Sequence, residues 1–322
     1  MNKRQFTRIF PALLCALWAA PAFAAWPERA ITLIVPFGPG SNADIFARRY
    51  AERLSKAMGQ PVVIENRPGA NATLGLDRVA KSAPDGYTFG LASTTNTIAA
   101  PLLQKTVPYD FRRDLTPIGG IYQIPTVLLV AGNSPYTSYA QLLAYTRANP
   151  DKMSYGYAQS TAEISGANWR QVGAVKVTGV PYKSTPQAVV DLIGGQIPVV
   201  FSELSVALPQ IASGKARALA VIAPQRTPLL PNTPTFAEVQ PNGLSLVGFS
   251  GLMMPAGTPR EVVDRMAQVT RDILLEPDFV QFLASIGADP LVFATPAAFG
   301  DYLEKNEPVW RQLIQAAGIK AQ

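Results

Sequence analysis

Short β-branched runs alternate with helical patterns along this chain, and this alternation constrains the fold more than any other feature of the sequence. The first unit is a run at 31–35, a helical stretch at 43–58 whose apolar residues recur every four positions, and a second run at 61–65. Strand, helix and strand in about 35 residues form a βαβ unit. The alternation continues beyond it, with helical patterns at 138–149 and 185–193 between further strand-like runs.

Strands and helices that alternate and are joined by short loops predict an α/β fold, in which helices cover both faces of parallel sheets. Ligands of such sheets bind beyond the carboxyl ends of the strands, close to helix N-termini. A length of 322 residues predicts about two domains. We therefore expect two lobes with a ligand pocket between them.

The first 24 residues have the pattern of a secretory signal peptide. Three basic residues lie within the first eight, an apolar run follows at 9–20, and Ala22-Phe23-Ala24 supplies an A-x-A cleavage site. The apolar run is too short to span a bilayer, and no later apolar stretch reaches 18 residues. We expect a soluble exported protein with no membrane span. Removing the signal reduces the net charge from +6 to +3, and no stripe of Lys and Arg indicates a nucleic-acid partner.

The composition excludes several kinds of chemistry. The chain has no histidine, so catalysis by Ser-His-Asp or Cys-His and metal sites built on histidine are ruled out. Its one cysteine, Cys15, lies in the predicted signal peptide, so the exported chain has no disulfide, thiolate nucleophile or cysteine-bound metal. We predict a protein that is not an enzyme and uses no metal or cofactor.

A glycine-rich loop connects the first strand to the first helix. Residues 38–43 read GPGSNA, which matches G-x-G-x-x-A, and Glu65 ends the next strand 22 residues after Ala43. This is the pattern of a dinucleotide-binding loop, whose acidic residue holds a ribose. One interpretation is therefore an exported dinucleotide-dependent oxidoreductase that uses Gly38-Pro39-Gly40.

A second interpretation of the loop needs only its backbone. The N-terminus of a helix presents unpaired N–H groups and a partial positive charge, so small residues there let an anion approach closely. Gly38, Gly40 and Ser41 provide this access, and the side chains of Ser41 and Asn42 can cap the helix or donate to a carboxylate. Asp44 lies in the first turn, where an acid favours the helix. A turn that binds nothing is the third interpretation.

Seven segments, taken in order, resemble one family over nearly the whole exported chain. They are ITLIVPFGPG at 31–40 with Asp44, GQPVVIENRPGA at 59–70, APDGYT at 83–88, VPYK at 180–183, LIGGQ at 192–196, GKARALAV at 214–221 and PAGTP at 255–259. The chain resembles the Bug receptors, or TctC family, which are the extracytoplasmic solute-binding receptors of tripartite tricarboxylate transporters. This implies a two-lobed, type II-like periplasmic binding protein that closes on a small organic acid and presents it to a membrane permease.

The resemblance also implies a division of the chain. We expect a signal peptide at 1–24, one lobe at 25–124 with 246–322, and a second lobe at 125–245. The proline-rich segment 224–241 is predicted to be an extended connection between the lobes, because prolines would break a helix there. We expect a monomer located in the periplasm.

The ligand-binding residues carry over from the family pattern. In the family a carboxylate is held mainly by loop backbone and bridging waters, at a strand-helix loop of one lobe and a helix N-terminus of the other. The residues that this pattern assigns are Phe37, Gly38, Gly40, Ser41, Asn42, Ala43 and Asp44 in the first loop, Ser93 and Thr94 in a hydroxyl-rich loop, and Tyr157, Ser160, Thr161, Ala162, Glu163 and Ser202 in the second lobe.

The sequence departs from the family pattern at two places. A histidine that is common soon after Thr161 aligns with Ile164, and the usual Phe-Asp pair is Phe201-Ser202, with Glu203 next. The loss of a carboxylate at Ser202 argues against a ligand that carries an ammonium group. We expect a mono- or dicarboxylate, and aromatic residues such as Phe37 are compatible with an aromatic body.

Overall fold

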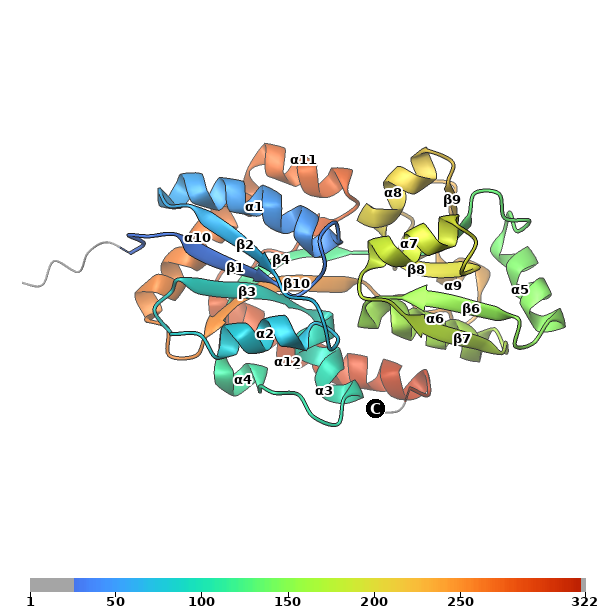
Figure 1. Ribbon diagram of the computed structural model, residues 1–322, viewed down its shortest axis with the longest axis horizontal. Helices are drawn as coiled ribbons and strands as arrows, with labels where there is room; N and C mark the ends of the chain where they lie inside the picture. Colours follow the sequence, from blue (N-terminus) through green and yellow to red (C-terminus); the bar gives the residue numbers. More distant parts are fainter. Residues whose placement is uncertain (1–25, 320–322) are drawn as a thin grey trace, which may run out of the picture.

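The computed structural model describes residues 26–319, which form the two lobes shown in Figure 1. One lobe contains a six-stranded sheet with the strand order β11-β4-β10-β3-β1-β2, and the other contains a five-stranded sheet with the order β7-β6-β8-β5-β9. The predicted two-lobed α/β fold is therefore confirmed. The predicted signal peptide and Cys15 lie outside the described residues.

The six-stranded sheet combines strands from both ends of the chain. In Figure 1, α1 and α11 lie on one side of this sheet, and α2, α4 and α12 lie on the other. The strands are β1 (Ile31–Val35), β2 (Val62–Asn66), β3 (Thr88–Ser93), β4 (Leu115–Ile124), β10 (Gly248–Pro255) and β11 (Asp289–Pro290). The helices are α1 (Asn42–Met58), α2 (Thr73–Ala80), the π-helical turn η1 (Thr94–Ala99), α3 (Ala100–Leu103), α4 (Phe111–Asp114), α10 (Arg260–Leu275), α11 (Pro277–Ser285) and α12 (Pro296–Ala316).

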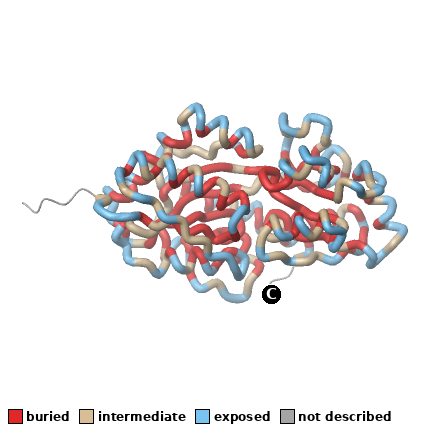
Figure 2. Tube along the Cα trace, turned by 45° about the horizontal axis from the view of Figure 1, so that its top comes forward, coloured by how far each residue is buried: buried red, intermediate tan, exposed pale blue. Residues whose placement is uncertain are grey.

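The five-stranded sheet is built from the middle of the chain. Its strands are β5 (Thr126–Ala131), β6 (Met153–Tyr157), β7 (Val177–Pro181), β8 (Val199–Glu203) and β9 (Ala216–Ile222). Its helices are α5 (Tyr139–Ala148), α6 (Ser160–Val172), α7 (Thr185–Ile193), α8 (Leu204–Ala212) and α9 (Phe236–Val239). Figure 2 shows buried segments that follow the strands through both lobes. Among residues 26–319, no helix is both long enough and apolar enough to cross a bilayer.

Both sheets are mixed, whereas the sequence predicted parallel sheets. β1 is parallel to β2 and β3, but β10 is antiparallel to β3 and β4. β6 is parallel to β7 and β8, but β5 is antiparallel to β8 and β9. The chain passes from β4 to β5 through Pro125 alone and later returns through β10. Strands that enter a sheet from the other lobe are not part of a βαβ repeat, so no crossover helix forces them to be parallel.

The sequence predicted that the proline-rich segment 224–241 is extended, but part of this segment is helical. It contains α9, where Thr235 and Glu238 form a capping box. Thr235 also forms a bridge with Val221 of β9, so the segment packs on the second lobe. Four residues free of proline are enough for one turn of helix when the N-terminus of that turn is capped.

Helix α1 begins and ends at local signals. The N-cap Ser41 Oγ accepts a hydrogen bond of 3.3 Å from the Asp44 N–H, and Gly59 adopts the left-handed conformation that ends the helix. The predicted apolar face is buried, with Phe46, Tyr50 and Leu54 fully inaccessible. Burial of such side chains contributes roughly 1.5–3 kcal/mol each. This burial holds the start of α1 against the sheet.

We expect Phe46→Ala to lower the free energy of unfolding by about 3–5 kcal/mol, because it leaves a cavity in a packed core. The Phe46 ring centroid lies 5.0 Å from that of Tyr122 and 5.4 Å from that of Tyr50. Urea denaturation measures the change. Val63→Ala is the control, since Val63 is 52% exposed and its loss should cost less than about 1 kcal/mol. Equal costs would contradict the packing described here.

Candidate functional site

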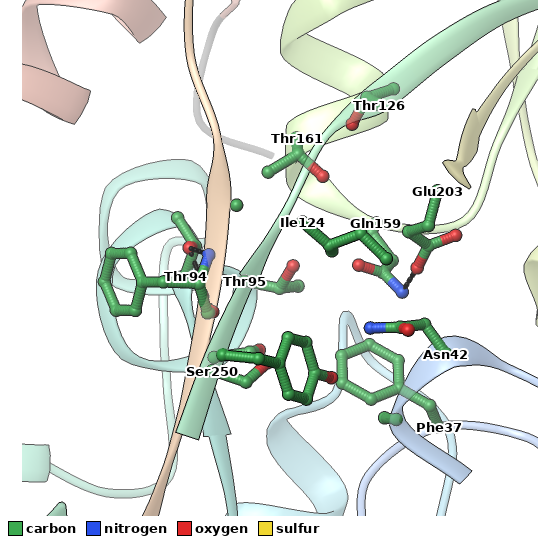
Figure 3. Close-up of a pocket in the computed structure, with 15 residues that line it drawn as sticks. Phe37, Asn42, Thr94, Thr95, Ile124, Thr126, Gln159, Thr161, Glu203 and Ser250 are labelled. Atoms are coloured by element: carbon green, nitrogen blue, oxygen red, sulfur yellow. Dashed lines mark hydrogen bonds between the residues drawn. The ribbon is translucent and has the colours of Figure 1, made fainter. Parts of the chain in front are cut away.

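A pocket lies between the lobes and is lined by residues of both sheets and of the loops that follow them (Figure 3). The lobes leave a cavity of about 20 Å³ between them, so the lining residues lie close together in this structure. The first lobe contributes Phe37, Asn42, Ala43, Ser93, Thr94, Thr95, Tyr122, Ile124, Gly248, Phe249 and Ser250, and the second contributes Thr126, Gln159, Thr161 and Glu203. Among these lining residues there is no Lys or Arg, so the wall presents mostly hydroxyl, amide and aromatic groups.

Asp44 holds the first loop in place without lining the pocket. Its carboxylate accepts hydrogen bonds of 2.9 Å from the Gly40 N–H and from Asn66 Nδ2, and it forms an ion pair with Arg48. Burial alone would raise the pKa of Asp44, but the hydrogen bonds from Arg48, Gly40 and Asn66 bring it below its usual value. Asp44 is thus an ionised anchor of the loop before α1.

The glycines of this loop face the other lobe. A Cβ at Gly38 would lie 3.2 Å from Ser184 Cβ, and one at Gly40 would lie 3.7 Å from Pro186 Cγ; both partners lie at the start of α7. Gly40 also has φ +74°, which favours glycine. Gly38 and Gly40 therefore let α7 come close to the loop and do not line the pocket. Ser41, which caps α1, does not line it either.

The hydroxyl-rich turn after β3 is held by several hydrogen bonds. Asn96 Oδ1 accepts a bond of 2.7 Å from the Ser93 N–H, and Asn96 Nδ2 donates to the Leu91 carbonyl. Thr94 Oγ1 accepts from the Phe249 N–H at 3.0 Å, which connects the turn to β10. Ser93 and Thr94, both predicted, line the pocket together with Thr95.

The N-terminus of α6 meets the first lobe across the pocket. The Ser160 N–H donates to Thr95 Oγ1 at 3.3 Å, which is a hydrogen bond between the lobes. Thr161 lines the pocket, whereas Ser160 and Ala162 are buried and do not. Tyr157 and Glu163, also predicted, line a separate hollow beside Asn71. Of the α6 residues assigned from the family pattern, the structure brings only Thr161 to the pocket.

β8 ends in two residues whose side chains have different surroundings. Ser202 is fully buried, and its Oγ donates to the Glu203 carbonyl at 3.0 Å, away from the pocket. The Glu203 side chain lines the pocket, and its carboxylate accepts a hydrogen bond from Gln159 Nε2. Successive side chains of a strand point to opposite faces, which explains the difference. The pocket therefore contains a carboxylate at Glu203, one residue after the position where the family comparison found an acid missing.

Burial raises the pKa of Glu203, and a hydrogen bond with Thr185 opposes this only in part. The residue is 5% exposed, and no cation is among the groups that shift its pKa. Glu203 is the only carboxyl group among the lining residues. The pocket thus contains one buried acid that has an amide partner and lacks a basic one.

Sequence reasoning missed the pocket residues on the strands that cross between the lobes. Tyr122 and Ile124 end β4, Thr126 begins β5, and Gly248 to Ser250 begin β10. The one local signal that the chain crosses between the lobes was Pro125, which stands between two strand-like runs. The alternation of side-chain directions along β8 could have identified Glu203, because it directly follows Ser202 and therefore points to the opposite face of the strand.

Comparisons with solved structures define the class of protein. Protein Rpa4515 of R. palustris, solved with adipate, matches with a TM-score of 0.89 and 32% identity over 92% of this chain and 100% of that one. MatC from Rhodopseudomonas palustris, solved with bound malate, matches with a TM-score of 0.83 and 28% identity over 90% of this chain and 100% of MatC. The fold and the pocket between the lobes are those of a solute-binding protein.

The family is shown by sequence. Residues 46–319 match the TctC family, described as "Tripartite tricarboxylate transporter family receptor", and the chain belongs to it. BugT of Bordetella pertussis is 32% identical over 306 residues, which cover 94% of this chain and 94% of BugT. The family resemblance drawn from the seven sequence segments is therefore confirmed.

We expect Asp44→Asn to lower the free energy of unfolding by about 1–2 kcal/mol at pH 7, because charge-assisted hydrogen bonds are lost. The pKa of Asp44 is depressed in the folded state, so its contribution is present above the usual value of 3.8 and disappears as the pH falls through the folded pKa. The difference between wild type and variant in urea denaturation should therefore be present at pH 7 and shrink as the pH is lowered below 3.8. Asp264→Asn, which breaks an exposed pair with Arg260 at the same helical spacing, should change stability little. A variant as stable as wild type at pH 7 would contradict the anchoring role.

Proposed function

We propose that the protein is a periplasmic solute-binding receptor, which captures a small mono- or dicarboxylate between its lobes and delivers it to the membrane permease of a tripartite tricarboxylate transporter. The observation that carries the proposal is a pocket between the lobes whose donors are neutral hydroxyl and amide groups. Such donors hold a carboxylate without a counter-ion. Two relatives solved with adipate and with malate support a carboxylate as the ligand.

The hydroxyl groups of Thr95, Ser250, Thr126 and Thr161 come from both lobes and supply donors on opposite walls. Micromolar affinity requires about −8 kcal/mol. Two or three hydrogen bonds to a charged group, at roughly 1.5–3 kcal/mol each, provide much of this. Because each lobe holds part of the donor set, full affinity requires the lobes to close.

We propose that residues 25–124 with 246–322 move as one lobe and 125–245 as the other. The strand crossings at 124–126 and at the start of β10 support this division. The A-x-A site after the apolar N-terminal run supports a periplasmic location. We propose a monomer that binds its ligand without converting it.

Two observations favour this function over a dinucleotide-dependent oxidoreductase. Ser184 and Pro186 at the start of α7 occupy the space in front of Gly38 and Gly40, where a pyrophosphate would lie. Glu65, the acid of the dinucleotide pattern, forms an ion pair with Arg67. The glycine loop therefore serves the contact between the lobes.

Titration of the purified protein with adipate, malate, benzoate and NAD tests the proposal. We expect at least one organic acid to raise the melting temperature and to release or absorb heat, and we expect NAD to do neither. A ligand at 100 times its Kd stabilises the folded state by about 2.7 kcal/mol, which is a measurable shift. A response to NAD with none to any carboxylate would reject the receptor function.

Closure of the lobes can be tested at Gly248. A Cβ at this position would lie 2.9 Å from Thr161 Cγ2 of the other lobe. We expect Gly248→Ala to weaken carboxylate binding about tenfold, equal to about 1.4 kcal/mol, with little change in the melting temperature of the free protein.

Two further variants control this experiment. Thr161→Ser removes the clashing methyl group and keeps the hydroxyl, so the double variant with Gly248→Ala should regain most of the affinity. Gly119→Ala, at a β4 position where a Cβ meets nothing within 4 Å, should bind like wild type. Calorimetric Kd values that are the same for wild type and Gly248→Ala would show that binding does not require this contact.

A further inference from the structure

One end of the pocket presents hydrogen-bond acceptors. Glu203 is 5% exposed and Asn42 is 3% exposed, and both line the pocket. Asn42 Oδ1 is buried and accepts no hydrogen bond among the described residues, although the amide group of Asn42 interacts with the neighbouring Tyr122 hydroxyl. Figure 3 shows the side chains of Asn42, Gln159 and Glu203 next to one another, while Thr94 and Ser250 lie apart from them. An acceptor that is buried without a donor is unfavourable, so the group that occupies this end should supply one.

Glu203 keeps free acceptor capacity although two side chains already donate to it. Gln159 Nε2 and the Thr185 hydroxyl each donate to the carboxylate, which has about four acceptor sites. Among the described lining residues no Lys or Arg faces it, and Tyr122 is the other titratable group of the pocket. Burial raises the pKa of Glu203, as expected for an acid without a cation. A donor on the ligand would satisfy both Glu203 and Asn42.

The opposite walls have a different chemistry. Thr95, Ser250 and Thr161 present hydroxyl groups that can donate to an anion, whereas Ser93 and Thr94 already donate to Asn96 and to the Phe249 carbonyl. The pocket therefore has hydroxyl groups that suit a carboxylate at one end, and at the other the carboxylate of Glu203 beside the hydroxyl of its cross-strand neighbour Thr126. A second carboxylate at the acceptor end would meet Glu203 as a like charge.

We propose that Glu203, together with Asn42, is the specificity-determining group of the pocket and selects a carboxylate whose far end carries a hydrogen-bond donor, either a hydroxyl or an ammonium group. This inference rests on the proposed function, which it narrows from mono- and dicarboxylates in general to donor-bearing monocarboxylates. Both groups donate hydrogen bonds, and the ammonium group differs from the hydroxyl group by its positive charge.

Calorimetry with matched linear carboxylates tests the inference. The probes are four series of three to six carbons that end in a hydroxyl, an ammonium, a methyl or a second carboxylate group. We expect the tightest ligand to be a hydroxy or amino acid, and to bind at least tenfold more tightly than the methyl and dicarboxylate compounds of the same length. A tightest ligand from the methyl or dicarboxylate series overturns the inference.

Variants identify the residues responsible. Glu203→Gln removes the charge and adds a donor, so we expect it to weaken the ammonium ligand at least tenfold, to weaken the hydroxyl ligand less, and to improve binding of the dicarboxylate. Glu163→Gln is the matched control, because Glu163 is also a buried glutamate with a raised pKa and lies outside the pocket. Unchanged ligand preference in Glu203→Gln, with the control also unchanged, overturns the assignment.

Three further outcomes complete the test. If Glu203→Gln does not fold, Asn42→Ala should still reduce the preference for donor-bearing ligands, and an unchanged preference would overturn the inference. If no linear compound binds wild type while benzoate does, the specificity assignment fails and the receptor function stands. If no carboxylate of any kind binds, the receptor function itself fails.

Discussion

The pocket depends on strands that pass directly from one sheet into the other. β4 reaches Ile124, and β5 begins at Thr126 after a single proline, while β10 returns at Gly248 beside the end of β4. Because these strands are hydrogen-bonded within their sheets, their ends hold the two lobes at a defined separation. The same residues form the floor of the pocket, so the connection between the lobes and the binding surface are one piece of structure.

The two lobes approach each other closely at glycine residues, which have no side chain. Gly38 and Gly40 face the start of α7, and Gly248 faces Thr161 of α6. Asp44 holds the loop that carries the first two glycines, through bonds to Gly40 and Asn66. The loop is thus kept in shape by an ionised residue outside the pocket, and the pocket itself contains neutral donors. The structural carboxylate of Asp44 is thus kept apart from the pocket wall.

The electrostatic character of the pocket is set by one residue. Glu203 is the single carboxyl group among the lining residues, and no Lys or Arg accompanies it. The family comparison of the sequence treated this position as a loss of charge, because Ser202 stands where an acid is usual. In the structure an acid stands one residue further along the strand, at Glu203, and it lines the pocket. A comparison of single positions in the sequence does not show this side-chain direction.

The sequence by itself determined the alternation of strands and helices, the boundaries of α1 through Ser41 and Gly59, and the family. These follow from local rules, namely periodicity, capping and short motifs, that act within a few residues. Only the tertiary structure decided that Asn42, Ala43, Ser93, Thr94 and Thr161 share a pocket with Tyr122, Ser250 and Glu203, while Glu163 and Ser202 do not. Contacts between residues more than 100 positions apart depend on how two sheets pack and cross, and no local pattern encodes that geometry.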